Sequence, residues 1–522
     1  MKLVTDTSSC HPLVGALRLG RPSDIWFKPA LSVVVSVAPP NVALLLLGRL
    51  DLAMYTMAGS LCALYAHNRP YAARARALAW VALGMLGGLA TALVAASLTS
   101  SAVVLVTVGA VLAAVQKVLC DATRIGPPGN VVLTFISSAA LFAPQTFVQI
   151  PGHVGLAATA AAWAWLVGMA PGLLRPHGPE RRATAGALNA AAGYVETGGT
   201  GGTGATSSQS RQSRQSRQSR QSRQSSQSGQ RSQGDHRAGA HASAAAAVHA
   251  ARQALHSAGR PGRPGRAGGT RRALERLVVR AEVALAAPAD ADPALLRTWA
   301  RQVRGTRPVP EVDDLANIGS ELTSPATPLR HRLAPLTPLA VRTALGCALA
   351  GYASLALGVG RPYWALVTAA CLYQANLTLT WGRGVQRVIG NLLGVLLFAA
   401  LVPLAHTGEI ALVVCCLALN FGAEALISRN YWLGSVCVTP MALLITEFAG
   451  FQEPGRLITE RVVDTLVGAL VGLVAAVVVP DRRWQRVVRA ERSGPRTLAA
   501  TGRSQGPRPD QRTGDTTEGV RP

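Results

Sequence analysis

The chain has 522 residues, of which 49% are hydrophobic and only 15% are charged, whereas a soluble globular domain carries about 25% charged residues. This composition excludes an ordinary soluble protein. The formal net charge is +25, and arginine in the loops and tails supplies it: residues 175–332 hold 24 Arg against 11 Asp and Glu, and residues 481–522 hold 10 against 5. We expect these segments to be attracted to an anionic membrane leaflet, and we expect no nucleic acid as a partner.

Twelve apolar stretches follow along the chain, and each has about the 17–25 residues that a helix needs to cross a bilayer. The first six cover residues 29–47, 50–66, 77–97, 102–120, 131–148 and 154–174, and the second six cover residues 339–357, 363–379, 385–405, 410–427, 431–448 and 462–479. We expect Pro39 and Pro40 to break the first stretch near its middle. The predicted fold is an all-α polytopic membrane protein of about twelve transmembrane helices, with one membrane half at 29–174 and the other at 339–480.

Basic residues alternate between the loops in a way that predicts the orientation of the chain. The basic segments hold Arg18, Arg21 and Lys28; Arg69, Arg74 and Arg76; Lys117 and Arg124; Arg175, Arg181 and Arg182; Arg330, Arg332 and Arg342; Arg383 and Arg387; Arg429; and Arg482, Arg483 and Arg486. Each loop between them holds one basic residue or none. Because basic loops stay in the cytoplasm, we expect residues 1–28, the central insert and the tail on the cytoplasmic side.

The two halves resemble each other in order. Residues 48–93 and residues 358–401 both read as a turn, a span with Leu-Tyr, a basic loop and a glycine-rich span, at an offset near 309 residues. Both halves begin on the cytoplasmic side, so the predicted repeat is parallel, with its axis along the membrane normal. A substrate path is then expected where the halves meet.

The cytoplasmic insert, residues 175–338, has two predicted parts. Residues 193–269 are of low complexity and include five tandem Ser-Arg-Gln triplets at 210–224. We expect this part to be disordered because it cannot bury enough apolar area. Residues 271–304 place apolar side chains on one helical face and then another, which predicts a small helical hairpin. The basic tail, residues 481–522, is also expected to be disordered.

The sequence contains no H-E-x-x-H, nucleotide-binding loop or G-x-S-x-G motif. The eight cysteines include no C-x-x-C pair, so we interpret them as small core residues rather than as disulfides or zinc ligands. We therefore expect no enzyme activity, no cofactor and no metal.

Two helix faces in the second half combine charged and small residues. They are Arg383, Arg387, Gly390 and Gly394 on one helix, and Arg461, Asp464, Thr465, Gly468 and Gly472 on another. Small residues at this spacing permit close helix approach. A carboxylate within a span is costly, so Asp464 is either functional or paired with Arg461, and both readings stay open. Glu424 and Glu447 are functional candidates for the same reason, and Glu424 could instead reach the membrane surface beside Arg429.

Together these motifs resemble the fusaric-acid-resistance-like (FUSC) family. The resemblance covers about residues 339–481. It rests on Tyr363-Trp364-Ala365 with Thr368-Ala369, Arg383 with Arg387-x-x-Gly390-x-x-x-Gly394, Asn430-Tyr431 with Thr439-Pro440-x-x-Leu443-Leu444, and Arg461-x-x-Asp464-Thr465-x-x-Gly468. The resemblance implies a bacterial inner-membrane protein of the kind regarded as aromatic-acid exporters, with two membrane halves around a cytoplasmic region. The first half matches the family only in layout, and the Ser-Arg-Gln insert is no part of its pattern.

The leading hypothesis is export of small organic, aromatic carboxylates from the cytoplasm across the inner (plasma) membrane. Arg383, Arg387 and Arg461 are expected at the cytoplasmic mouth, because guanidinium groups pair with carboxylates bidentately. Asp464, Glu424 or Glu447 could carry a proton if export is coupled to the proton gradient. A passive anion channel and a non-transporting scaffold acting through the insert are the alternatives. The expected partners are a small organic anion and the lipid bilayer, and assembly into a homo-oligomer stays open.

Overall fold

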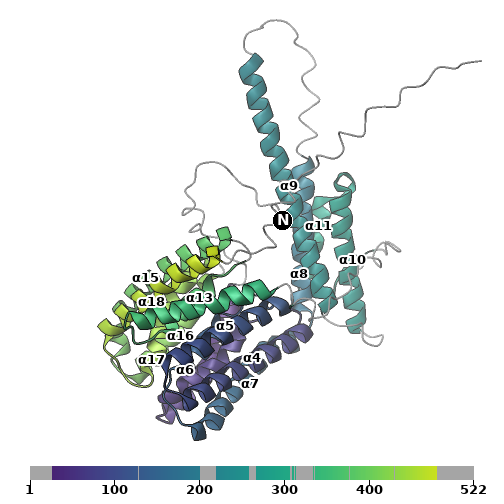
Figure 1. The fold of residues 1–522 in the computed structure, drawn as a ribbon. Helices are drawn as coiled ribbons and strands as arrows, with labels where there is room; N and C mark the ends of the chain where they lie inside the picture. The colour runs from purple at the N-terminus through teal and green to yellow at the C-terminus, as the bar shows by residue number, and fades with distance from the viewer. Residues whose placement is uncertain are drawn as a thin grey trace, which may run out of the picture. The chain divides into compact units, whose positions relative to one another are not determined.

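The structure, a computed structural model, describes residues 26–126, 128–199, 219–257, 266–305, 308–310, 312, 333, 336–374, 377–427 and 429–478. Every regular element in these ranges is a helix (Figure 1). The predictions for residues 1–25, for the tail after residue 480 and for the triplets at 210–218 lie outside the described residues.

The membrane part of the chain consists of two series of helices. The first is α2 (Phe27–Leu46), α3 (Ala53–Ser60) between the short turns η1 (Leu50–Leu52) and η2 (Leu61–Leu64), α4 (Tyr71–Leu98), α5 (Ala102–Thr123), α6 (Val131–Leu141), η3 (Phe147–Gln149) and α7 (Ile150–Leu174). The second is α13 (Thr337–Ala356), α14 (Tyr363–Leu372), α15 (Leu377–Ala405), α16 (Glu409–Ile427), α17 (Tyr431–Glu447) and α18 (Pro454–Val478).

Eight helices in the described residues are long and apolar enough to cross a membrane. They are α2, α4, α5, α7 with its preceding turn, α13, α15, α16 and α18. The other four predicted stretches form shorter apolar helices, at Leu50–Leu64, Val131–Leu141, Tyr363–Leu372 and Tyr431–Glu447. In each series the second and the fifth apolar segments are the short ones. Pro144, three residues beyond α6, is one reason for an early end, because proline disfavours helix in the residue before it.

The expected break at Pro39 and Pro40 is wrong, because α2 runs through both residues. A proline lacks the N–H that would bond to the carbonyl four residues earlier, so Pro39 leaves the carbonyl of Val35 without its helical donor. The indole Nε1 of Trp163 on α7 donates to this oxygen at 3.1 Å. A neighbouring helix thus satisfies the group that proline frees, as membrane helices require.

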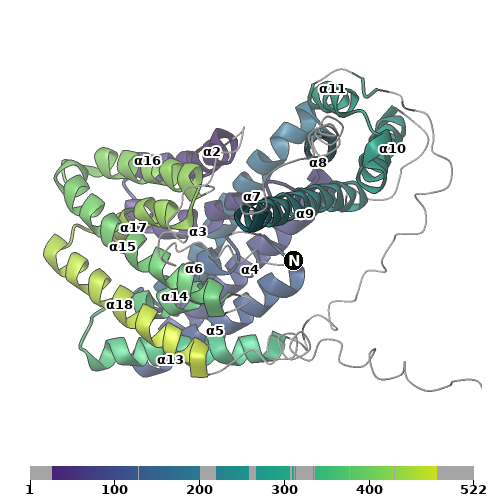
Figure 2. The ribbon, with the colours of Figure 1, turned by 90° about the horizontal axis from the view of Figure 1, so that it is seen from above.

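Helix pairs recur at the same positions in the two series. In the first, α3 packs on α7, α4 packs on α6 and α7, and α5 packs on α6; in the second, α14 packs on α18, α15 packs on α17 and α18, and α16 packs on α17. Between the series, α2 packs on α16 and α13 packs on α5 (Figure 2). The first helix of each series therefore lies against the fourth apolar segment of the other.

Many apolar side chains on these helices face outward, while several charged side chains are buried. Trp80 is 69% exposed and Leu470 is 66% exposed, whereas Arg461 is 1% exposed. This is the reverse of a soluble protein, in which charged residues are almost never fully buried. It is the distribution expected of helices surrounded by lipid.

The described part of the insert is a separate group of helices. It consists of α8 (Gly178–Gly199), α9 (Ser219–Ser257), α10 (Arg266–Ala286), η4 (Pro288–Asp290) and α11 (Pro293–Arg304). The last two helices lie where a helical hairpin was expected. The expectation of disorder over 193–269 is wrong for α9, because its alanine-rich end is helical and buries Val248, Ala251 and Leu255 in a common core with α8 and α10. Alanine is the strongest helix former, so three apolar positions on one face are enough to bring this stretch into the core.

Candidate functional site

Small residues allow the helices of the second series to approach closely. A Cβ atom at Gly390 of α15 would lie 2.7 Å from the carbonyl oxygen of Trp432 of α17, and Gly394 meets α17 one turn further on. A Cβ atom at Gly468 of α18 would overlap the carbonyl oxygen of Ala365 of α14. The two predicted small-residue faces thus pack against α17 and α14. Charged residues that share those faces are carried into the interior.

Arg461 of α18 is one of these buried charges. Its guanidinium carbon lies 4.0 Å from the centroid of the Trp364 ring at the start of α14. Its Nε and Nη1 atoms are buried and have no hydrogen-bond partner in the described part of the chain. We expected this residue at the cytoplasmic mouth; the structure instead places it inside the helix packing, in a helix whose first residue faces the outer side in the charge-derived orientation.

Arg383 and Arg387 lie in the second and third turns of α15, and both meet Tyr431, the first residue of α17. The guanidinium carbon of Arg383 lies 3.9 Å from the Tyr431 ring centroid. The Nη1 atom of Arg387 donates a hydrogen bond of 3.3 Å to the Tyr431 hydroxyl, while its Nε atom is buried without a partner. Arg383 is half-buried and Arg387 is buried. One aromatic side chain therefore orients two of the three predicted substrate-binding arginines.

Asp464, one turn after Arg461 on α18, is fully buried. The Ser354 hydroxyl of α13 donates a hydrogen bond of 2.5 Å to its Oδ1 atom, and its Oδ2 atom has no hydrogen-bond partner in the described residues. No ion pair within 4.0 Å joins Asp464 to Arg461, although the two charges interact at longer range. The structure therefore does not have the direct ion pair that was one of the two readings of this carboxylate.

A chain of neutral polar groups links three helices beside these charges. The Thr439 hydroxyl of α17 donates to the side-chain oxygen Oδ1 of Asn391 on α15 at 2.7 Å. Asn391 Nδ2 donates to the Thr465 hydroxyl of α18 at 3.0 Å. Thr465 in turn donates to the carbonyl of Arg461 at 2.7 Å. Asn391 and Ser354 were not among the site residues predicted from the sequence. The one available signal was the helical spacing, since Asn391 lies four residues after Arg387 on the same face.

We call Ser354, Arg387, Asn391, Arg461, Asp464 and Thr465 the buried polar cluster. Arg387 and Arg461 are close enough to interact as like charges, and Asp464 is the one carboxylate of the cluster. Several guanidinium N–H groups of Arg387 and Arg461 point to no acceptor. Because a buried N–H group without an acceptor is unfavourable, this surplus of donors suits the site to an anion with oxygen acceptors. In the part of the chain that the structure describes, no group of three or more His, Cys, Asp or Glu could hold a metal ion.

The structure does not bring Glu424 and Glu447 to this cluster. Glu447, at the end of α17, is buried, and both of its oxygens lie 3.2 Å from Nε2 of His406, which follows α15. Glu424, on α16, is half-buried and makes no hydrogen bond or ion pair with a described residue, Arg429 included. The three predicted proton carriers therefore lie in three different environments, and only Asp464 lies beside the arginines.

The first series lacks a corresponding polar cluster. When α7 and α18, both of 25 residues, are aligned from their first residues, Ala157, Ala160 and Ala161 stand at the positions of Arg461, Asp464 and Thr465. The same alignment of α4 with α15 places Gly84 and Gly88 at Gly390 and Gly394, and Val81 and Met85 at Arg387 and Asn391. At these aligned positions the glycines of α15 recur in the first series, whereas the charged residues of α15 and α18 do not.

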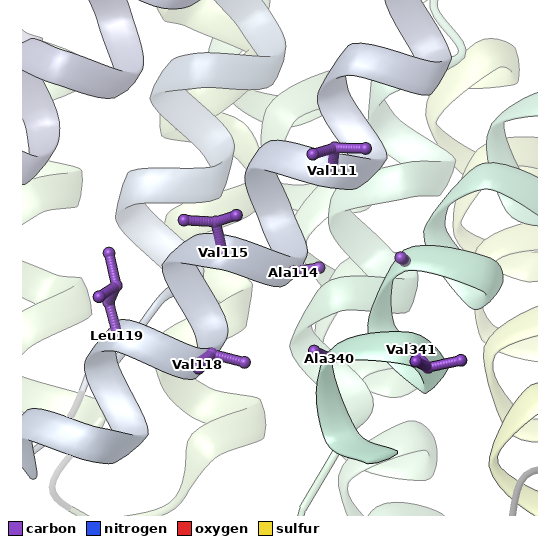
Figure 3. Close-up of a pocket in the computed structure, with 8 residues that line it drawn as sticks. Val111, Ala114, Val115, Val118, Leu119, Ala340 and Val341 are labelled. Carbon is purple, nitrogen blue, oxygen red and sulfur yellow. The ribbon is translucent and has the colours of Figure 1, made fainter. Parts of the chain in front are cut away.

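A groove of about 370 Å³ lies elsewhere in the membrane part, between α5 and α13 (Figure 3). It is lined by Val111, Ala114, Val115, Val118, Leu119, Ala340, Val341 and Ala344. All eight lining residues are aliphatic, and none belongs to the buried polar cluster. An apolar groove without polar groups cannot orient a charged solute, so the buried polar cluster is the candidate site.

The fold and the cluster together define a polytopic helical membrane protein with a charged site buried among its helices. Residues 348–475, which contain the whole cluster, match the family described as Fusaric acid resistance protein-like. The resemblance drawn from the sequence motifs is thereby confirmed for this segment.

Two curated relatives also match the chain. A protein of Bacillus subtilis (strain 168), described as uncharacterized membrane protein YvaC, is 33% identical over 135 residues, or 26% of this chain and 21% of the relative. An uncharacterized protein of Haemophilus influenzae is 33% identical over 139 residues, or 26% of this chain and 18% of the relative. The chain thus matches about a fifth of the length of each relative. No solved structure matches significantly.

Proposed function

We propose that the chain crosses a bacterial inner (plasma) membrane twelve times, as two parallel six-helix repeats with both termini and the insert in the cytoplasm. The recurring helix pairs support the repeat, since α4–α6 and α15–α17 occupy equivalent places, as do α3–α7 and α14–α18. The reciprocal contacts of α2 with α16 and of α13 with α5 support an axis along the membrane normal. The alternation of basic loops supports the orientation.

We propose that the protein exports small organic carboxylates from the cytoplasm. The observation that supports this most is the pair of buried arginines, Arg387 and Arg461, whose N–H donors exceed the acceptors around them. A carboxylate would supply the missing acceptors and offset the repulsion between the two guanidinium groups. Arg383, half-buried at the start of α15, would meet the anion first.

Aromatic side chains beside the arginines support aromatic acids as the substrate class. The Tyr363 and Trp364 ring centroids lie 4.8 Å apart, and the Phe135 ring of α6 lies 5.5 Å from Trp364. Stacked or edge-to-face contacts with such rings stabilise a planar aromatic molecule beyond the effect of apolar burial. This arrangement also brings the first series to the site, through Phe135.

Proton coupling is the proposed energy source, with Asp464 as the carrier beside the substrate. Its Oδ2 atom has no hydrogen-bond partner among the described residues, so it can accept a proton without losing a bond. A passive anion channel would use the same arginines without needing the carboxylate. Glu447 and Glu424 are second candidates for proton transfer, because each lies in an apolar helix and neither forms an ion pair with an arginine among the described residues. Neither the coupled exporter nor the channel needs a cofactor or enzymatic chemistry.

Export from loaded cells tests the function directly. Cells with wild-type protein, Arg387→Ala or Arg387→Lys are loaded with radiolabelled fusaric and hydroxybenzoic acids, before and after collapse of the proton gradient. Arg387→Ala is expected to reduce export at least about tenfold, because a charged hydrogen bond contributes ~1.5–3 kcal/mol. Arg387→Lys should retain part of it.

Arg429→Ala is the matched control, because it removes an exposed positive charge from the same half. Its export should equal that of the wild type. Unchanged export by Arg387→Ala at equal membrane levels would contradict the proposal. Export that survives collapse of the gradient would favour the channel over the coupled exporter.

A further inference from the structure

Arg74 is a further buried arginine, besides Arg342, Arg387 and Arg461, and the proposed export does not use it. It lies in the first turn of α4 and is 7% exposed. Its Nη2 atom lies 3.2 Å from Nδ1 of His67 and 3.6 Å from the Cβ position of Gly168 on α7. Its Nε atom is buried and has no hydrogen-bond partner among the described residues. The side chain therefore lies between α4 and α7, with its Nε donor unused among the described residues.

No carboxylate of the described residues neutralises this charge. The titratable groups that act on Arg74 are Tyr71 and Cys62, neither of which is charged at neutral pH. Burial, and then the charge of Arg74, lower the pKa of His67 to about 4, so the imidazole is neutral as well. Glu180, which acts on Tyr71, forms no ion pair within 4.0 Å with Arg74. An uncompensated buried charge is strongly unfavourable, so an anion from outside the described chain would stabilise this site.

The surface beside Arg74 is suited to an amphipathic anion. Leu173 and Leu174, at the end of α7, are 88% and 87% exposed, and Trp80 of α4 is also exposed. The ring of Tyr71, the first residue of α4, lies 3.0 Å from the Cβ position of Gly172, the residue before these leucines. Arg175, which follows Leu174, interacts electrostatically with the Tyr71 hydroxyl, as Arg74 does. Basic groups thus meet an aromatic ring and exposed aliphatic side chains at one end of two spanning helices, as at a membrane interface.

We propose that Arg74 binds the phosphate of an anionic phospholipid at the end of the α4–α7 helix pair. The guanidinium group would pair with the phosphate oxygens, and the acyl chains would lie along the exposed leucines of α7. The site is separate from the buried polar cluster and does not depend on export. In the charge-derived orientation it faces the cytoplasmic leaflet, where anionic lipids attract basic segments.

Thermal unfolding of the purified full-length chain in lipid nanodiscs tests this assignment. The wild type is compared in phosphatidylcholine alone and in phosphatidylcholine with phosphatidylglycerol, together with Arg74→Gln, Arg74→Lys and the control Arg76→Gln. Arg76 is exposed on the same turns of α4. The number of bound lipids per chain is measured in parallel by native mass spectrometry.

Phosphatidylglycerol is expected to raise the unfolding midpoint of the wild type and of Arg76→Gln by several degrees. Arg74→Gln should lose this rise and one tightly bound anionic lipid. In phosphatidylcholine alone, Arg74→Gln should be at least as stable as the wild type, because it removes an uncompensated charge. Arg74→Lys should keep part of the rise, since it retains the charge without the planar fork.

An equal rise in wild type and Arg74→Gln would overturn the proposal, and so would a wild type that does not respond to phosphatidylglycerol. If inorganic phosphate in phosphatidylcholine reproduces the whole effect, the oxyanion comes from solution and the lipid assignment is wrong. If Arg74→Gln does not fold, Arg74→Lys decides: a full rise with unchanged lipid binding would contradict recognition by the guanidinium fork.

Discussion

Ser354 of α13 donates a 2.5 Å hydrogen bond to Asp464 of α18, across 110 residues of the chain. The bond joins the first and the last helix of the second series through a carboxylate that is fully buried. It also leaves the other oxygen of that carboxylate without a partner among the described residues. Because Oδ1 keeps its bond to Ser354, Asp464 can gain and lose a proton at Oδ2 without breaking the contact between α13 and α18.

The Asp464→Asn variant separates a proton carrier from a structural carboxylate. The amide keeps the size of the side chain and can still accept from Ser354, but it cannot bind a proton. We expect export to lose its dependence on the proton gradient, as measured in loaded cells over a range of external pH. Glu453→Gln, an exposed carboxylate change just before α18, should behave as the wild type. Gradient dependence unchanged in Asp464→Asn would show that the proton is carried elsewhere.

Two glycine substitutions should affect the stability of the chain differently. Gly468→Ala places a methyl group against the Ala365 carbonyl, whereas a Cβ atom at Gly87 of α4 meets nothing within 4 Å. Overpacking costs about 1–3 kcal/mol, while alanine favours a helix over glycine by about 1 kcal/mol. We therefore expect Gly468→Ala to lower the thermal unfolding midpoint in detergent and Gly87→Ala to raise or preserve it. Equal effects of the two changes would mean that α14 and α18 are not in close contact.

Two deletions in the insert distinguish a spacer from a structural helix. Removing residues 200–218 leaves α8 and α9 intact and should not change export or protein level. Removing residues 239–257 takes Val248, Ala251 and Leu255 out of the core of the insert, and we expect lower protein levels in membranes and faster proteolysis of the insert. If the first deletion abolishes export at normal protein levels, the alternative of a scaffold that acts through the insert gains support. If the second has no effect on levels or proteolysis, the packing of α9 does not contribute to stability.

His67 should make the stability of the chain depend on pH. Its pKa in the folded chain is lowered to about 4 from an ordinary value of 6.5, mainly by burial. The unfolded chain therefore binds the proton first as the pH falls. The associated stability is complete above pH 6.5 and is lost on acidification toward pH 4, by up to roughly 3 kcal/mol.

The unfolding midpoint of His67→Gln in detergent should consequently fall less steeply than that of the wild type between pH 6.5 and pH 4. His177→Gln is a useful comparison, because burial also lowers the pKa of His177, with Arg181 as the second cause. Superimposable pH profiles for wild type and His67→Gln would show that the imidazole is not buried in the folded protein.

Much of the membrane architecture could be predicted from the sequence, because the bilayer restricts which backbone structures can cross it. A spanning segment must satisfy its backbone groups internally, so long apolar stretches predict helices without knowledge of their neighbours. The 3.6-residue period likewise places Arg461, Asp464 and Gly468 on one face of a helix. Periodicity failed where packing decided the outcome, as at Pro39, whose freed carbonyl is satisfied by Trp163 from a distant helix.

Which helix faces are charged and which are small follows from residue spacing within single helices and could be predicted. Which side chains those faces meet depends on the packing of distant helices: Trp364 beneath Arg461, Ser354 beside Asp464, and Asn391 between Thr439 and Thr465. That packing also separated Glu424 and Glu447 from the arginines and left Arg74 without a described carboxylate. The physical reason is that the register between helices far apart in the chain depends on side-chain interlocking across their interfaces, which no local pattern encodes.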